Sequence, residues 1–206
     1  VPPAGITPAR SGLPGAQLCS MFRVCRSAKT PSGAGTYTPR VVLRASLRQV
    51  AARMAEPRCD QAFVYGSLMA PEVTTLLINR MPEAAPAVLK GHRRWSVKNA
   101  DYPAIIPSDP AGEVSGLLLQ GLSDRDLMIL DEYEDDDYHR ATVTVTTEDG
   151  GKHMAFVYVW NDSERHKLDT SRTWDYDYFR REKLEQYVKM VEMYAVEISR
   201  HWEDPK

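Results

Sequence analysis

The sequence predicts an α+β fold in which short strands form a meandering sheet or a barrel and helices pack against it. Three features predict this class: short apolar segments between residues 61 and 119 that alternate with turn residues, a hairpin signal near residue 150, and a long amphipathic pattern at the end of the chain. Repeated βαβ units are disfavoured, because each parallel crossover needs a dozen or more residues.

The chain divides into a basic leader, residues 1–57, and an acidic body, residues 58–206. Residues 1–58 hold nine basic residues and one acidic residue, whereas residues 59–206 hold 17 basic and 27 acidic residues. The leader carries seven of the 14 prolines and no sustained apolar period, so we expect it to be disordered or loosely ordered. Its composition is typical of a transit peptide, but a cloning remnant or translated upstream sequence would have the same character.

Composition also disfavours several classes of protein. No stretch approaches the ~20 apolar residues that cross a bilayer, and the acidic body has no basic stripe to bind nucleic acid. The three cysteines, Cys19, Cys25 and Cys59, all lie before the body's first strand, so they cannot cross-link it as in a secreted disulfide scaffold. We therefore expect a cytoplasmic protein, or a plastid or mitochondrial one if the leader is a native transit peptide. The oligomeric state stays open.

The first half of the body is expected to contain most of the strands. An apolar, β-rich run begins at Gln61 and stops at Gly66, and Pro71 suits the first turn of a short helix that continues to Ile78. Further short strands are predicted at residues 87–89, 94–98, 104–106 and 114–119, separated by glycine, proline and aspartate. Their spacing predicts a meander or a barrel.

The second half of the body is expected to contain two helices and a hairpin. Ser123 and Asp126 form a capping-box pattern that opens a helix reaching about Tyr133. Strands over residues 138–147 and 153–160 flank Asp-Gly-Gly at residues 149–151, which predicts a hairpin. Apolar residues at steps of three and four predict a long amphipathic helix over residues 176–202.

The step from the first strand into its loop, residues 65–70, is the first candidate site. A glycine after an apolar strand allows successive backbone amides to face outward and form an anion-binding nest for a carboxylate or phosphate. An ordinary strand-ending turn has the same sequence pattern, and the residues around Ser67 lack the Gly-x-Ser-x-Gly pattern of a nucleophile elbow.

An acidic cluster is the second candidate site, because six of the seven residues at 131–137 are carboxylates. Like charges at a helix C-terminus repel one another and the helix dipole, so a partly buried member should have a raised pKa and accept a proton as a general base. Most of the cluster is equally well explained as a solvated acidic loop. The five histidines show no metal-ligand spacing, so no metal site is predicted.

Together these motifs resemble the gamma-glutamylcyclotransferase-like family, in particular its plant avirulence-induced members. The resemblance rests on Phe-Val-Tyr-Gly-Ser-Leu-Met at residues 63–69, Tyr-Pro-Ala-Ile-Ile-Pro at residues 102–107, Leu-Asp-Glu-Tyr-Glu at residues 130–134, Tyr-His-Arg at residues 138–140, and Trp-Asp at residues 174–175 before a long helix. It covers about residues 60–200.

The resemblance implies a small mixed β-barrel of about five to seven strands, flanked by helices, and a cyclotransferase site that uses no metal or organic cofactor. Glu134 would be the general base, taking a proton from the α-ammonium of a small γ-glutamyl substrate, whose freed amine attacks its own γ-carbonyl and releases 5-oxoproline. The loop would bind the substrate's α-carboxylate, and three further residues would support the site. The loop residues are Tyr65, Gly66, Ser67, Leu68, Met69 and Ala70, and the supporting residues are Tyr102, Tyr138 and Arg140.

One departure from the family pattern leaves a second function open. Many members have glycine directly after the catalytic glutamate, whereas three aspartates, residues 135–137, follow Glu134 in this chain. They place negative charge near a site that must accept a carboxylate. The alternative is a non-catalytic module on the same fold that binds a ligand or a protein.

Overall fold

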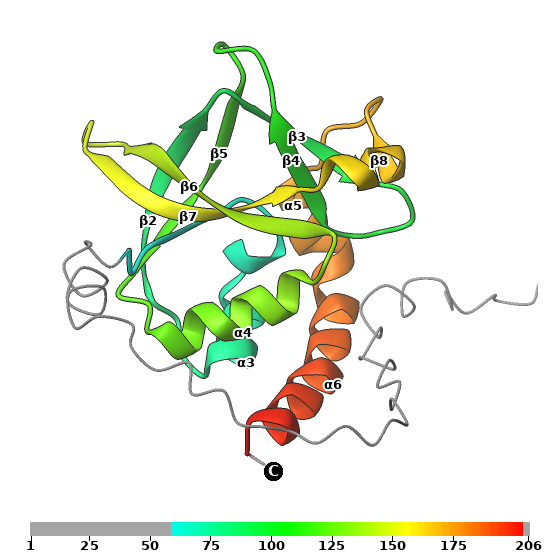
Figure 1. Cartoon of the computed structure of the whole chain (residues 1–206). Helices are drawn as coiled ribbons and strands as arrows, with labels where there is room; N and C mark the ends of the chain where they lie inside the picture. The colour runs from blue at the N-terminus through cyan, green and yellow to red at the C-terminus, as the bar shows by residue number, and fades with distance from the viewer. Residues whose placement is uncertain (1–58, 204–206) are drawn as a thin grey trace, which may run out of the picture. The chain divides into compact units, whose positions relative to one another are not determined.

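A computed structural model describes the backbone of residues 59–203 and the side chains of residues 59–196. The predicted leader, residues 1–57, lies outside this range. The described residues form a closed β-barrel, a second small sheet and several helices (Figure 1). Among the helices of this part of the chain, none is long and apolar enough to cross a membrane.

The barrel has five strands in the order β1-β5-β2-β6-β7. β1 (Ala62–Val64) pairs antiparallel with β5 (Glu113–Gln120) and parallel with β7 (Lys152–Trp160), which makes the barrel mixed. β2 (Glu83–Lys90) lies between β5 and β6 (Tyr138–Thr147), and β6 pairs with β7 as the predicted hairpin. The prediction of a small mixed barrel with flanking helices is confirmed.

Two of the predicted strands leave the barrel. β3 (His92–Val97) and β4 (Pro103–Pro107) form a separate sheet with β8 (Leu168–Asp169), in the order β4-β3-β8. The reason lies in the pairing of β2, which takes β5 as its antiparallel partner over its whole length. The β3–β4 hairpin is therefore an excursion between two barrel neighbours, and local strand patterns cannot distinguish it from barrel strands.

The helices α3 (Pro71–Ile78) and α4 (Asp124–Glu134) lie together at one end of the barrel (Figure 1). α3 begins with its proline in the first turn, where the missing N–H costs no hydrogen bond. α4 begins with the predicted capping box: the Asp126 amide donates to Ser123 Oγ at 3.1 Å, and the Ser123 amide donates to Asp126 Oδ2 at 2.9 Å. α4 ends at Glu134.

The predicted C-terminal helix is present, with a wider turn near its start. α5 (Tyr176–Tyr178), the π-helical segment η3 (Phe179–Lys183) and α6 (Leu184–Glu203) follow one another directly. The fully buried ring of Phe179 lies 5.2 Å from that of Tyr187, centroid to centroid. A π-turn shifts the helix face that follows it, so the direction of the α6 side chains differs from that of an uninterrupted helix.

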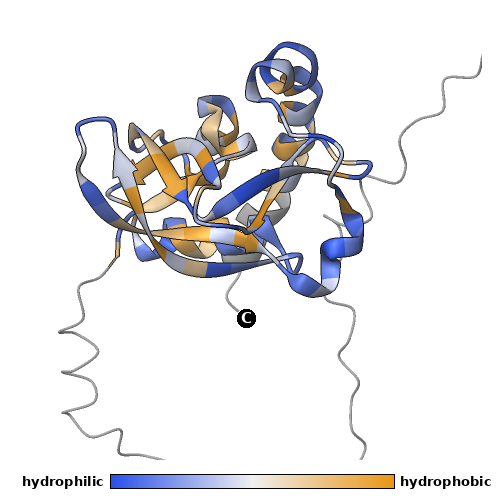
Figure 2. Cartoon of the chain, turned by 90° about the horizontal axis from the view of Figure 1, so that it is seen from above, coloured by the Kyte–Doolittle hydropathy of each residue, from blue (hydrophilic) through white to orange (hydrophobic). Residues whose placement is uncertain are grey.

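Apolar side chains fill the interior of the barrel, and hydrophobic residues are prominent along its strands (Figure 2). The ring of Phe63 points inward and needs space from the neighbouring strand. A Cβ at Gly116 of β5 would lie 2.7 Å from this ring and 2.3 Å from the carbonyl oxygen of Val64. Glycine at this position therefore allows the first strand to pack tightly, immediately before the loop of the candidate site.

Candidate active site at the end of helix α4

The predicted anion-binding loop is a single turn of 3₁₀-helix, η1 (Ser67–Met69). The amides of Met69 and Ala70 donate to the carbonyl oxygens of Gly66 and Ser67, each at 3.0 Å. The first amides of a helical turn have no acceptor within that turn. Those of Ser67 and Leu68 are therefore the candidate donors to an anion. Four side chains of the loop are buried and hold its backbone in place: Tyr65, Ser67, Leu68 and Ala70.

Gly66 allows this loop to pass close to the segment of Tyr102 and Pro103. A Cβ on Gly66 would lie 2.8 Å from the Cγ and Cδ atoms of Pro103. Tyr138 reaches the same segment, because its hydroxyl donates to the Pro103 carbonyl at 2.8 Å. Tyr102 packs against the apolar cluster that includes Trp160. The fold therefore gathers the loop and two of the predicted supporting residues in one place.

Glu134, the predicted base, is the last residue of α4, and its side chain is partly buried. No residue among 59–196 forms a hydrogen bond or an ion pair with its carboxylate. Burial raises the pKa of Glu134 from its ordinary 4.5 to about 8. A carboxyl group with this pKa changes protonation near neutral pH, which suits a general base.

Five tyrosines lie within the electrostatic reach of Glu134. Burial is the main cause of the raised pKa of each phenol, and the negative charge of Glu134 adds to it. None of these hydroxyls donates to Glu134: Tyr65, for example, donates to the Tyr158 carbonyl at 2.6 Å, and Tyr138 donates to Pro103. The phenols therefore lie near the carboxylate without supplying it with a hydrogen bond. The five are Tyr65, Tyr133, Tyr138, Tyr158 and Tyr187.

Three buried hydroxyls form a closed triangle that joins the loop to two helices. Tyr187 of α6 donates to Ser67 Oγ at 3.2 Å, the Tyr133 and Tyr187 oxygens are 2.7 Å apart, and Ser67 Oγ lies 3.2 Å from the Tyr133 oxygen. If each hydroxyl donates once and accepts once, all three are satisfied. The triangle connects η1 to the residue before Glu134, so it holds the loop beside the base.

Arg140, a predicted supporting residue, is an exposed residue of β6 that pairs with α4. Its Nη1 pairs with Asp131 Oδ2 at 2.8 Å, and its guanidinium lies 4.5 Å from the centroid of the Phe156 ring. The Tyr158 hydroxyl also donates to Asp131, at 2.8 Å. Arg140 thus ties α4 to the barrel strands β6 and β7 just before Glu134, without a direct contact to the loop.

The three aspartates after Glu134 form a turn with its own structural bonds. Asp135 has φ 57° and ψ −174°, a backbone conformation that is almost restricted to glycine. Its carboxylate accepts from the Asp136 amide at 2.7 Å, and Lys167 Nζ at the end of η2 (Asp162–Lys167) pairs with Asp137 at 2.8 Å. Burial and the neighbouring aspartates raise the pKa of Asp135.

Three residues of this region were missed by the sequence analysis: Tyr133, Tyr187 and Arg94. The two tyrosines read as core residues of amphipathic helices, although a phenol on an apolar helix face needs a polar partner and can be recognised as such. Arg94 is adjacent to Arg93 on β3, and strand alternation places one of the two inward. The sequence does not indicate which one.

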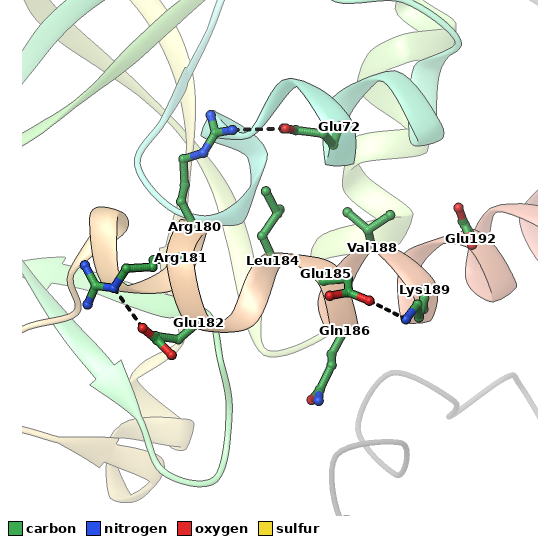
Figure 3. Close-up of a pocket in the computed structure, with 10 residues that line it drawn as sticks. All are labelled: Glu72, Arg180, Arg181, Glu182, Leu184, Glu185, Gln186, Val188, Lys189 and Glu192. Carbon is green, nitrogen blue, oxygen red and sulfur yellow. Dashed lines mark hydrogen bonds and ion pairs between the residues drawn. The ribbon is translucent and has the colours of Figure 1, made fainter.

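Within the described part of the chain, no group of three or more His, Cys, Asp and Glu side chains is placed to hold a metal ion. A pocket of about 470 Å³ lies along η3 and α6, but most of the charges lining it pair with one another (Figure 3). Arg180 binds Glu72 at 3.0 Å, and Lys189 binds Glu185 at 2.7 Å. None of the predicted site residues lines it.

The sequence of this chain matches one protein-family model and several known proteins. The family model described as "Gamma-glutamyl cyclotransferase, AIG2-like" matches residues 62–177. AIG2-like protein D of Arabidopsis thaliana is 40% identical over 139 residues, which are 66% of this chain and 90% of that protein. A protein of Methanocaldococcus jannaschii, named gamma-glutamylcyclotransferase and putative RNase, is 31% identical over 99 residues, 47% of this chain and 44% of that protein.

The fold comparison agrees with the sequence comparison. A solution structure of an Arabidopsis thaliana protein has 34% sequence identity to this chain and a TM-score of 0.52. The match covers 66% of this chain and 81% of that one. The resemblance predicted from the motifs is therefore confirmed.

Proposed function

The chain belongs to the gamma-glutamyl cyclotransferase, AIG2-like family, and from this premise we propose that it releases 5-oxoproline from a small γ-glutamyl compound, with Glu134 as the general base. The substrate is a γ-glutamyl amine, amino acid or peptide. The name of the Methanocaldococcus jannaschii relative assigns this type of activity to that protein.

The proposed reaction needs one proton acceptor and one fixed substrate conformation. The Glu134 carboxylate takes a proton from the substrate's α-ammonium, and the free amine attacks the carbonyl carbon at the end of the same side chain. A new C–N bond closes a five-membered ring. The bond to the departing amine then breaks as this amine takes the proton back from Glu134. The ring nitrogen gives its second proton to the same carboxylate, which passes it to the released amine, so that the amine leaves as an ammonium ion. Because both reacting groups belong to one molecule, holding them in the attacking geometry supplies much of the rate enhancement.

The main support for the proposal is the partly buried Glu134 carboxylate, which has no hydrogen bond or ion pair among the described residues. Beside it lies the loop in which the amides of Ser67 and Leu68 have no acceptor within their own turn. A substrate ammonium would supply the missing partner. The pKa of Glu134, about 8, is much closer than that of an ordinary carboxylate to the pKa of an α-amino group, which is about 8 at a peptide terminus and higher beside a free α-carboxylate. Proton transfer from the substrate to Glu134 would therefore cost less free energy than transfer to an exposed glutamate.

The loop would bind the other end of the amino acid unit. The hydroxyls of Tyr65 and Ser67 are both bonded to protein groups, which leaves the backbone amides of Ser67 and Leu68 as donors to the substrate's α-carboxylate. The triangle that links Ser67 to Tyr133 sets the spacing between this loop and the base. Binding one carboxylate and one ammonium at fixed separation selects for an α-amino acid group.

The test is 5-oxoproline release by the 206-residue chain from γ-glutamyl amino acids, γ-glutamyl amines and glutathione. Glu134→Gln keeps the shape of the side chain and removes the base, so we expect turnover to fall by at least ~100-fold. Glu132→Gln removes a carboxylate from an exposed position on the same helix and should leave turnover unchanged. Circular dichroism of each variant controls for folding.

The outcomes separate an enzyme from a binding module. Release that depends on Glu134 identifies both the activity and the substrate class. Undiminished release by a folded Glu134→Gln protein would show that another group is the base. If no substrate is turned over but one of them raises the melting temperature, the domain is a ligand-binding module.

A further inference from the structure

Arg94 places a guanidinium beside the anion-binding loop. Its Nη1 donates to the carbonyl oxygen of Tyr65 at 2.7 Å and to that of Ser115 at 3.4 Å. The guanidinium also lies over the Trp174 ring, 5.4 Å from the centroid. Tyr65 is the residue directly before Gly66, so the positive charge is attached to the start of the loop.

This charge lacks a negative partner among the described residues. The Nε of Arg94 is buried and has no hydrogen-bond partner there, and no carboxylate lies within ion-pair distance of the guanidinium. Burial lowers the pKa of Arg94, and the charge of Asp175 opposes this only in part. The Asp175 carboxylate accepts from the Tyr178 amide at 2.6 Å. Buried charges in proteins are normally paired, because desolvation is costly.

The neighbouring Arg93 differs from Arg94 in both exposure and pairing. Its side chain is exposed, and its Nη2 lies 3.6 Å from Asp109 Oδ2. Successive residues of a strand point to opposite faces, so Arg93 faces solvent while Arg94 faces the loop. Arg94 is thus an inward arginine whose Nε has no hydrogen-bond partner among the described residues, next to an exposed, ion-paired arginine.

The electrostatics of the site explain why a cation is needed. Glu134 and the three aspartates after it repel a substrate carboxylate, and backbone amides carry only partial charges. The nearby guanidinium can offset this repulsion, and its planar donors match the two oxygens of a carboxylate. Arg94 can therefore offset the repulsion between the aspartates at residues 135–137 and a substrate carboxylate.

We propose that Arg94 is a substrate-binding residue that pairs with the α-carboxylate of the γ-glutamyl group, together with the loop amides. This inference rests on the proposed function for the identity of the ligand. It adds a charged residue from β3 to a site otherwise formed by the loop and α4. It also restricts the ligands to those that retain the carboxylate.

Two small ligands that differ only in this carboxylate test the proposal directly. 5-Oxoproline carries it and 2-pyrrolidinone lacks it. Affinities are measured by calorimetry for the 206-residue chain and for Arg94→Met, Arg94→Lys and Arg93→Met. We expect Arg94→Met to weaken 5-oxoproline binding by about 10- to 100-fold, the range for hydrogen bonds to charged groups, and to leave 2-pyrrolidinone unaffected. Arg94→Lys should lose less, and Arg93→Met nothing.

Three results would overturn the inference. The first is unchanged 5-oxoproline affinity in Arg94→Met. The second is an equal loss for both ligands, which would mean that Arg94 only holds the Tyr65 carbonyl in place. The third is an unsubstituted protein that binds 5-oxoproline no better than 2-pyrrolidinone.

The experiment also separates this inference from the proposed function, because binding requires no turnover. A protein that binds 5-oxoproline through Arg94 but converts no γ-glutamyl compound would support the inference and refute the enzymatic function. An active enzyme whose KM is the same in Arg94→Met would refute the inference alone.

Discussion

Replacing Glu134 with Gln should stabilise the folded protein, and the gain should grow with pH. Burial raises the folded-state pKa of Glu134 to about 8, from 4.5 in an ordinary environment. Between these two values the folded protein retains a proton that the unfolded chain releases. The carboxyl group therefore lowers the free energy of unfolding progressively as pH rises through this window, with no cost below it and the full cost above it.

The size of the effect follows from the pKa difference. A shift of about 3.5 units corresponds to at most about 5 kcal/mol above pH 8, about 3 kcal/mol at pH 7 and about 1 kcal/mol at pH 5. Because the side chain is only partly buried, solvent screens part of this cost. We expect Glu134→Gln to be more stable by about 1–3 kcal/mol at pH 7 and by less than about 1 kcal/mol at pH 5.

Urea unfolding at pH 5, 6, 7 and 8 measures this difference, with Glu132→Gln as the matched control. Glu132 is an exposed residue of the same helix, so its replacement removes the same charge near the same helix C-terminus. We expect a shift of less than about 0.5 kcal/mol that does not vary with pH. A gain in Glu134→Gln that is constant from pH 5 to 8, or no larger than in the control, would refute the conclusion that burial sets this pKa.

Three further predictions concern the same region. Because Glu134 must be ionised to act as a base, kcat/KM should rise about tenfold per pH unit up to a pKa of about 8, and it should fall at the higher pH where the substrate's α-ammonium loses its proton; a flat profile from pH 5.5 to 9.5 would exclude Glu134 as the base. Asp135→Gly should raise stability in urea unfolding by about 1 kcal/mol, since the backbone at Asp135 is one that glycine adopts freely, while Asp135→Ala should give no gain. Tyr187→Phe should cost about 1–2 kcal/mol in thermal unfolding by opening the hydroxyl triangle, whereas Tyr178→Phe, whose side chain is 46% exposed, should cost almost nothing.

The local elements could be predicted because the interactions that define them are between near neighbours in the chain. The helix that begins at Pro71 and the capping box at Ser123 and Asp126 both depend on residues within four positions of one another. The hairpin over residues 138–160 depends on a short turn between two strands. The interior π-turn at residues 179–183 was missed, because its sequence has the same apolar spacing as an ordinary helix.

The candidate base and loop could be named from the sequence because both belong to short, continuous motifs. The sequence could not show why Glu134 and the loop can act together. Glu134 has a raised pKa because of burial, among tyrosines drawn from four parts of the chain, and burial is a property of packing. The same motif on a solvent-exposed helix end would have an ordinary carboxylate.

By itself, the sequence determined the class of fold, the helix and hairpin positions and the motifs of the site. The tertiary structure alone decided that β3 and β4 leave the barrel, that Arg94 rather than Arg93 faces the loop, and that Tyr187 closes a triangle with Ser67 across 120 residues. The physical reason is the separation along the sequence between the residues that interact. Helix caps and turns are set by neighbouring residues, whereas burial, charge pairing and strand order depend on contacts that form only when distant segments pack.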